Sequence, residues 1–342
     1  MGVPLGLFVS QEDWSSIMTR YVLKRIGLMI VTTLIIIFMV FAFVRMMPDL
    51  KIQADPSIDP AILQQLLERD GIGKGPIIEQ FFRWINNMFE YKSLGYSLRE
   101  PREVTDMIGE RLIVSIRINI IPYLLSIPIG ISLGIWAALK KNKITDHVIS
   151  TGVMILISVP SFVIGVLLQY YFAFKLNWVP WKVARGTDFT NNIWIGLSSY
   201  ILPVVMLTLG GIAGLARLTR AELTEVLTSE FMLLCRTKGL NRRQSTIRHG
   251  IRNALVPIAP GLIGGLVGIL SGAIVTEQIF QIRGIGQLYI TAFTATSGTK
   301  PDYPIIMALI MFYTVIGLTA TLVIDLSYGV IDPRIRMGAG KR

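Results

Sequence analysis

The chain has 342 residues, of which 52% are hydrophobic and only 16% are charged, and its formal net charge is +11. Soluble domains carry about a quarter charged residues. Here the charges lie between long uncharged runs, which indicates a membrane protein with several spans. A single cysteine, Cys235, excludes an intramolecular disulfide and any zinc site built from several thiolates. This composition disfavours a soluble enzyme, a disulfide scaffold and a nucleic-acid-binding domain.

Six apolar runs are long enough to cross a bilayer as helices, because about 20 residues at 1.5 Å each span a hydrocarbon layer of about 30 Å. They cover residues 26–44, 118–139, 148–174, 191–216, 254–276 and 303–324, and the second is expected to begin near Leu112. Prolines inside several runs are compatible with a packed bundle, where neighbouring helices satisfy the freed carbonyl groups. The sequence therefore predicts an all-α integral membrane protein with six transmembrane helices.

The basic residues of the connecting segments predict the orientation of the spans. Basic groups precede the first run, follow the second, dominate the segment before the fifth and recur in the tail, and six spans place all four groups on one side. We therefore expect a cytoplasmic N-terminal segment at 1–25, a first transmembrane helix at 26–46, an extracellular segment at 47–111, a five-helix membrane core at 112–330 with a cytoplasmic loop at 217–252, and a cytoplasmic tail at 331–342. Within the extracellular segment, residues 60–69 and 77–89 are expected to be helical.

The sequence contains no motif for ATP hydrolysis. The glycine cluster at 71–75 lacks the spacing of a phosphate-binding loop, and no strand precedes it. The uncharged runs also lack the buried acids, bases and histidines that proton and ion relays use. A self-sufficient channel or secondary transporter is therefore the weaker alternative, as is a membrane-anchored scaffold, which needs neither six spans nor glycine-rich helices. We expect no catalytic residue, no metal and no cofactor in the chain itself.

Glycines recur every four residues in the fifth run, at Gly264, Gly268 and Gly272. This spacing aligns them on one helix face and lets another backbone approach closely. The pattern predicts helix packing. A gating role and a pore lining that leaves room for a large solute are the alternative interpretations.

The most informative segment is the basic loop at 217–252. Residues 221–238 contain neither glycine nor proline and end at Gly239, which is typical of a helix with a glycine cap, and a second helix is expected from about Asn241. A solvated basic loop has no need of exposed apolar residues, so the pattern indicates a docking element for a cytoplasmic partner. Its candidate contact residues are Glu230, Phe231, Leu233, Leu234, Cys235, Arg236, Lys238, Gly239 and Leu240.

This loop resembles the EAA loop of ABC-importer permeases, in the form found in the oligopeptide/dipeptide/nickel permease family. The residues Leu233-Leu234-Cys235 stand where the general motif has Glu-Ala-Ala. Further stretches resemble the same family: 20–25, 95–111, 249–257, 277–286, 302–304 and 325–336. The long outer segment resembles the B-type subunit of the permease pair.

The resemblance implies the type I ABC-importer permease fold and one of two membrane subunits of an ATP-driven, binding-protein-dependent importer of oligopeptides or dipeptides. Its implied partners are a C-type permease subunit, two ATPase subunits that bind ATP and magnesium, and an extracellular or periplasmic substrate-binding protein. The implied location is a bacterial or archaeal cell membrane. Relatives of the same family carry nickel complexes or glutathione-like solutes, which remain alternative substrates.

Overall fold

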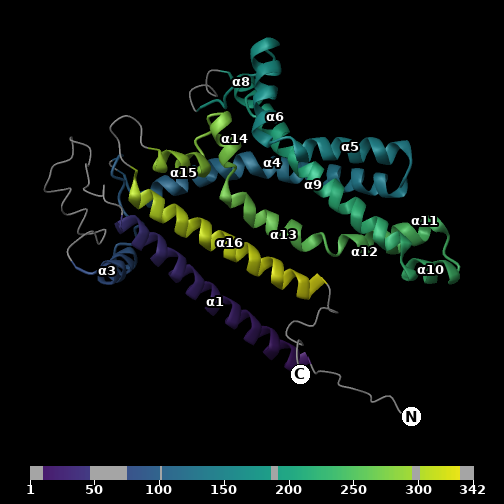
Figure 1. Ribbon diagram of the computed structural model, residues 1–342, viewed down its shortest axis with the longest axis horizontal. Helices are drawn as coiled ribbons and strands as arrows, with labels where there is room; N and C mark the ends of the chain where they lie inside the picture. Colours follow the sequence, from purple (N-terminus) through teal and green to yellow (C-terminus); the bar gives the residue numbers. More distant parts are fainter. Residues whose placement is uncertain (1–10, 47–74, 101, 186–191, 295–300, 332–342) are drawn as a thin grey trace.

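The computed structural model describes residues 11–46, 75–100, 102–185, 192–294 and 301–331. Every named element in these ranges is helical (Figure 1), and the only extended pairing among them is an isolated bridge between Tyr96 and Glu103. The expected helix at 60–69 lies outside the described residues. The expected helix at 77–89 is confirmed as α3 (Ile77–Glu90).

Five helical stretches in the described ranges are long and apolar enough to cross a membrane, and a bent helix pair makes a sixth. The prediction of an all-α membrane protein is thus confirmed. The five stretches are α1 (Gln11–Met46), α4 (Val104–Leu139), α8 (Ile193–Ser198) with α9 (Ile201–Thr228), α13 (Ala259–Gly268) with α14 (Ile274–Ile279), and α16 (Tyr303–Ile331).

The bent pair corrects the prediction of one continuous span at 148–174. Helix α5 (Ile144–Ser158) and the helical segment that begins with α6 (Ser161–Leu168) meet at an angle of 96°. Between them Val159 is extended, with φ −80° and ψ 125°. The cause is Pro160, which lacks a backbone N–H and disfavours helical geometry in the residue before it.

Several helices extend beyond their uncharged runs, and in two of them the extension changes the expected bounds. Helix α4 begins at Val104 rather than near Leu112, and α9 continues through the expected loop boundary to Thr228. Counting only uncharged residues therefore underestimates the length of helices whose ends carry polar side chains. Part of the segment predicted as loop 217–252 is a helical extension of a span.

The membrane helices pack side by side in several pairs. Helix α4 packs most extensively against α9, and α1 lies beside α16 (Figure 1). The N-terminal half of α1 meets the C-terminal end of α16 through an ion pair of 3.0 Å between Arg25 and Asp325. These two helix ends therefore lie on the same side of the bundle, as an even number of crossings requires.

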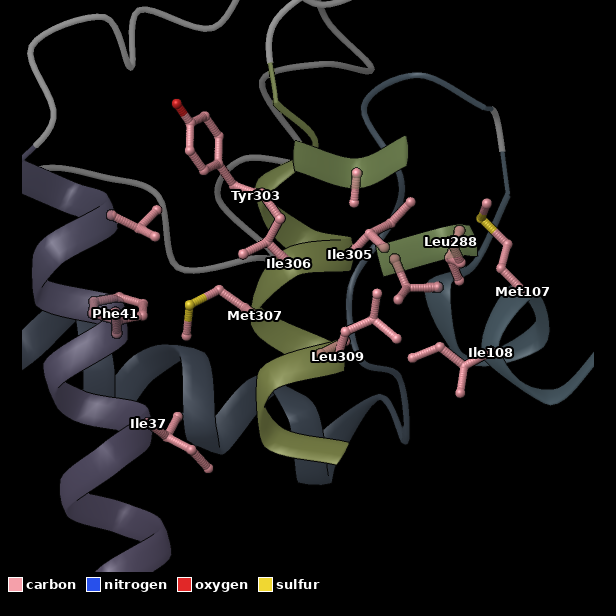
Figure 2. Packing of buried hydrophobic residues seen from close by; sticks show 14 of the residues in the cluster. Ile37, Phe41, Met107, Ile108, Leu288, Tyr303, Ile305, Ile306, Met307 and Leu309 are labelled. Carbon is pink, nitrogen blue, oxygen red and sulfur yellow. The ribbon is translucent and has the colours of Figure 1, made fainter. Parts of the chain in front are cut away.

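A large apolar cluster joins α1, α3, α4 and α16 with α15 (Ile285–Phe293). Figure 2 shows Phe41 of α1 facing Met307 of α16, with Leu309 turned toward Ile108 of α4. The ring of Phe81 on α3 lies 5.5 Å from that of Phe41, in an edge-to-face arrangement. Amphipathic α3 thus lays its apolar face on the end of the bundle.

Candidate functional site

The segment predicted as a docking element forms a short helix, α10 (Glu230–Thr237), at the end of α9. The single helix expected over 221–238 is broken at Ser229, which has φ −73° and ψ 154°. The hydroxyl of Ser229 donates to the carbonyl of Val226 (2.7 Å), and that of Thr228 donates to the carbonyl of Glu225 (3.0 Å). Such local bonds compete with the helical ladder, which explains a break without glycine or proline.

One face of α10 holds it against the rest of the chain. Met232 and Cys235, three residues apart, are only 1% and 6% exposed. The ring of Phe231 packs edge-on against His249, with the centroids 6.0 Å apart. Cys235, which was predicted among the contact residues, therefore faces the bundle rather than solvent.

The other face of α10 is open. Leu233 and Leu234 are 62% and 53% exposed, and Phe231 is also partly accessible. The remaining predicted contact residues are exposed except Leu240, which is half-buried: Glu230, Arg236, Lys238 and Gly239. Since exposed leucines cost free energy in water, this anchored helix presents a surface suited to a partner.

Gly239 and the helix after it set the direction in which the chain continues from the end of α10. Gly239 has φ +90°, and a Cβ atom placed there would have no neighbour within 4 Å. Its role is thus conformational rather than one of close packing. Asn241 then begins α11 (Arg242–Ser245) with a capping box, in which its side chain accepts from the N–H of Gln244 (2.8 Å). The chain continues through α12 (Ile251–Leu255) toward α13, as expected.

Helix α9 is fixed to α5 close to α10. Asp146, 1% exposed, accepts two hydrogen bonds from Arg220, at 2.5 Å from Nε and 2.8 Å from Nη2. It also accepts from the backbone N–H of Asn142 and the hydroxyl of Ser150. A bidentate pair with its remaining lone pairs satisfied holds two helices in one register.

At the opposite end, a buried carboxylate organises the connection between α14 and α15 (Figure 1). Glu277 is fully buried and accepts from the hydroxyl of Ser115 (2.7 Å) and the N–H groups of Gln287 (2.8 Å) and Ala273 (3.2 Å). A Cβ atom on Gly284 would lie 2.5 Å from both carboxylate oxygens, so this glycine makes room for them. Glu277 directly follows the uncharged run 254–276, and the helical span Ala259–Ile279, which covers most of this run, continues past it.

A second buried carboxylate lies before α16. Asp302 accepts from the hydroxyl of Ser97 (2.6 Å) and from the N–H groups of Leu98 (3.1 Å) and Arg99 (3.2 Å). The guanidinium of Arg99 then donates to the carbonyls of Thr291 (2.6 Å) and Thr294 (2.9 Å). Burial raises the pKa of the Asp302 carboxyl above its usual value, while the hydrogen bond from Ser97 opposes this shift.

The predicted glycine face in the fifth run is not one continuous surface. Gly264 contacts Ile324 of α16 closely, Gly268 ends α13 and has open space within this chain, and Gly272 lies outside the helix with φ +70°. The helix ends before Gly272, so the four-residue spacing does not keep the three on one face.

A contact between glycines and the backbone of a neighbouring helix joins α4 and α9. A Cβ atom on Gly134 would lie 2.7 Å from the carbonyl oxygen of Ala216, and one on Gly130 would lie 3.1 Å from that of Ile212. Sequence reasoning missed these residues, although Gly130 and Gly134 form a GxxxG pair inside an apolar run.

The described residues bring together no group of three or more His, Cys, Asp or Glu side chains that could hold a metal ion. The candidate site consists of surfaces and helix ends. Several apolar spans with an anchored helix at one end make a membrane protein that offers this helix to a partner.

The comparisons identify this class more closely. The chain belongs to the family of binding-protein-dependent transport system inner membrane components, whose model matches residues 130–337. It is 33% identical to the dipeptide transport system permease protein DppB of Lactococcus lactis subsp. cremoris, over 94% of this chain and 100% of the relative. It is 31% identical to the oligopeptide permease OppB of Salmonella typhimurium (93% and 100%) and 32% identical to the glutathione permease GsiC of Escherichia coli K12 (93% and 99%).

The fold agrees with the family. A solved structure of the MetNI methionine ABC transporter in inward facing conformations matches with a TM-score of 0.51 at 12% identity, over 67% of this chain and 97% of that chain. The chain thus has the type I ABC-importer permease fold and is a multi-pass permease component of a bacterial cell membrane. Components of this family are not enzymes themselves and operate with ATPase and substrate-binding partners.

Proposed function

We propose that this chain is one of two permease subunits of an ATP-driven importer of dipeptides or oligopeptides. The observation that carries the proposal is the similarity to dipeptide and oligopeptide permeases over nearly the whole length of both chains. The companion subunits are a C-type permease, two ATPase subunits and an extracellular or periplasmic substrate-binding protein. ATP hydrolysis belongs to the ATPase subunits, and this chain forms half of the translocation pathway.

In this proposal α10 is the element that receives motion from an ATPase subunit. Its exposed leucines enter a groove on the ATPase, while Met232 and Cys235 fix it to α9 and to the segment before α13. The ion pair between Asp146 and Arg220 carries displacement of α9 to α5. Transport then requires that α10 binds differently in the two ATPase states, because a partner shifts an equilibrium only through differential affinity.

In the proposed orientation of the chain in the membrane, α10 and both termini lie in the cytoplasm and residues 47–111 lie outside. Basic residues on the α10 side support it. The single cysteine makes a direct test simple, because Cys235 is buried. Lys238→Cys is expected to react with a membrane-impermeant maleimide only after cells are opened. Labelling in intact cells would overturn the orientation.

Peptide transport is tested by uptake in cells with and without this chain. Labelled peptides of two to six residues are supplied, and uptake is expected to fall to background on deletion and to return with the intact gene. Glutathione forms a separate arm, because the similarity to a glutathione permease makes this tripeptide the second candidate. Loss of glutathione uptake alone, with peptide uptake unchanged, would assign the chain to that substrate instead.

A further inference from the structure

A large cavity lies where the ends of α4 and α9 meet α10 and α11. Its volume is about 730 Å³, and its apolar wall includes Leu139, Leu227 and Ile247. The rest of the lining is strongly basic and contains no acidic residue. The basic residues that line it are Lys140, Lys141, Lys143, Arg236, Arg242 and Arg243.

These six cations come from three separate segments: the turn between α4 and α5, helix α10 and helix α11 (Figure 1). Within the described ranges none of the six forms an ion pair with a carboxylate. A general excess of basic residues on this side would explain their number, but it does not explain why they surround one cavity. Arg248 and Arg252, exposed in the same region, do not line it. Six like charges around one space repel each other, so an anion in that space stabilises the arrangement.

The position and the lining indicate what kind of anion fits. Trp136 on α4 is exposed and precedes Lys140 by about one helical turn, and tryptophan is enriched at the level of lipid headgroups. The lining combines apolar and cationic side chains, which suits a ligand that carries both a phosphate and hydrocarbon. The volume is within the range of about 300–1,000 Å³ that is typical of small-molecule sites.

The docking surface of α10 shares only Arg236 with the cavity. Leu233 and Leu234 do not line the cavity, and only Arg236 of α10 does. A partner bound through the leucines therefore leaves the cavity free. This separation favours a membrane component over an acidic part of the ATPase as the occupant.

We propose that this cavity binds the phosphate group of an anionic phospholipid from the cytoplasmic leaflet, an inference that rests on the proposed orientation but not on the peptide substrate. Basic pockets beside transmembrane helices on this side of a membrane recognise such headgroups. A bound phosphate bridges the α4–α5 turn to α10 and α11, and so holds the docking helix in place relative to two spans.

The test uses the complete purified importer, with its ATPase subunits, in nanodiscs that contain phosphatidylethanolamine and a small fraction of phosphatidylglycerol. After detergent washing, native mass spectrometry measures which lipid stays bound. The unmodified complex is expected to retain phosphatidylglycerol selectively. The double variant Arg242→Gln/Arg243→Gln is expected to lower this retention about tenfold or more, and Lys140→Gln/Lys141→Gln in the turn between α4 and α5 is expected to do the same.

Arg248→Gln/Arg252→Gln is the matched control, because it removes the same charge from the same region outside the cavity. It is expected to retain the lipid within about twofold of the unmodified complex. Equal losses in the control and the cavity variants would show adsorption to a basic surface and overturn the proposal. Binding of inorganic phosphate without any lipid preference would also overturn it, as would a complete importer, ATPase subunits included, that retains no phosphatidylglycerol. No peptide is present, so a failure of the proposed substrate leaves this result unchanged.

Discussion

The two ends of the bundle differ in how their charged side chains are paired. At the α15 end, Glu277 and Asp302 are buried, and each accepts several hydrogen bonds from neighbouring segments. At the α10 end, basic side chains surround a cavity without carboxylate partners, and the leucines of α10 are exposed. The first end pairs its buried carboxylates with donors of this chain, whereas the second pairs Asp146 with Arg220 but leaves the six cavity cations without a carboxylate partner in the described ranges. Partner binding is thus expected to alter the α10 end and to leave the α15 connections intact.

Helices α4 and α9 connect these ends. Ser115 of α4 belongs to the Glu277 network, and the other end of α4 lines the basic cavity. Close backbone contact at Gly130 and Gly134 makes the pair a rigid unit. In the proposed coupling, motion received at α10 is therefore expected to reach the far end as displacement of whole helices rather than by bending.

The largest effect is expected from Gly134→Leu. A side chain here would meet the backbone of Ala216 and Arg220, which cannot move without separating α4 from α9. The variant is expected to lose most of the assembled complex, measured by size-exclusion chromatography of detergent extracts. Gly268→Leu is the matched control with open space in this chain, and its yield is expected to be normal. Equal yields for the two variants would contradict the rigid-pair interpretation.

Glu277→Ala comes next, because it leaves the donors of Ser115, Ala273 and Gln287 without their acceptor. Unpaired buried donors cost about 1–3 kcal/mol each, so a loss of about 3 kcal/mol or more is expected. The measurement is the thermal unfolding midpoint of the purified complex. Glu277→Gln keeps part of the network and is expected to lose less, while Gln278→Ala, an exposed neighbour, is expected to have no effect. Equal midpoints for all three would show that the carboxylate does not stabilise this end.

The sequence predicted the spans well because hydropathy and length are local properties. It missed the bend at Pro160 and the break at Ser229, since each depends on local backbone competition within an otherwise helical pattern. It also missed Glu277, which follows an apolar run directly and is buried only through Ser115, far away in the chain. Which face of α10 is buried could not be predicted, because Met232 and Leu233 are equally apolar and only packing distinguishes them.

Gly239→Val is expected to act on coupling more than on stability. Valine has room at this position, so only the positive φ opposes it, at about 1 kcal/mol or more. The altered backbone direction after α10 is expected to abolish stimulation of the ATPase by substrate-loaded binding protein, while complex yield stays near normal. Gly239→Asn is the control, since asparagine tolerates positive φ better than valine, and it is expected to retain most of the stimulation. Full stimulation in Gly239→Val would remove α10 from the transmission path.

The smallest effect is a pH dependence at the α15 end. Burial raises the pKa of Asp302 in the folded protein above its usual value of 3.8, so the folded state binds the proton more tightly than the unfolded state. Stability is therefore expected to be greatest below 3.8 with respect to this group and to fall as the pH rises through the raised pKa. Asp302→Asn, which keeps an oxygen for Ser97 and Leu98, is expected to remove this slope from the thermal midpoint measured between about pH 4 and 7. Glu100→Gln, an exposed acid in the adjoining segment, is expected to leave it unchanged. If the thermal midpoint still falls with pH in Asp302→Asn, the pH dependence belongs to another group. Asp302 would then stabilise the α15 end only through its hydrogen bonds.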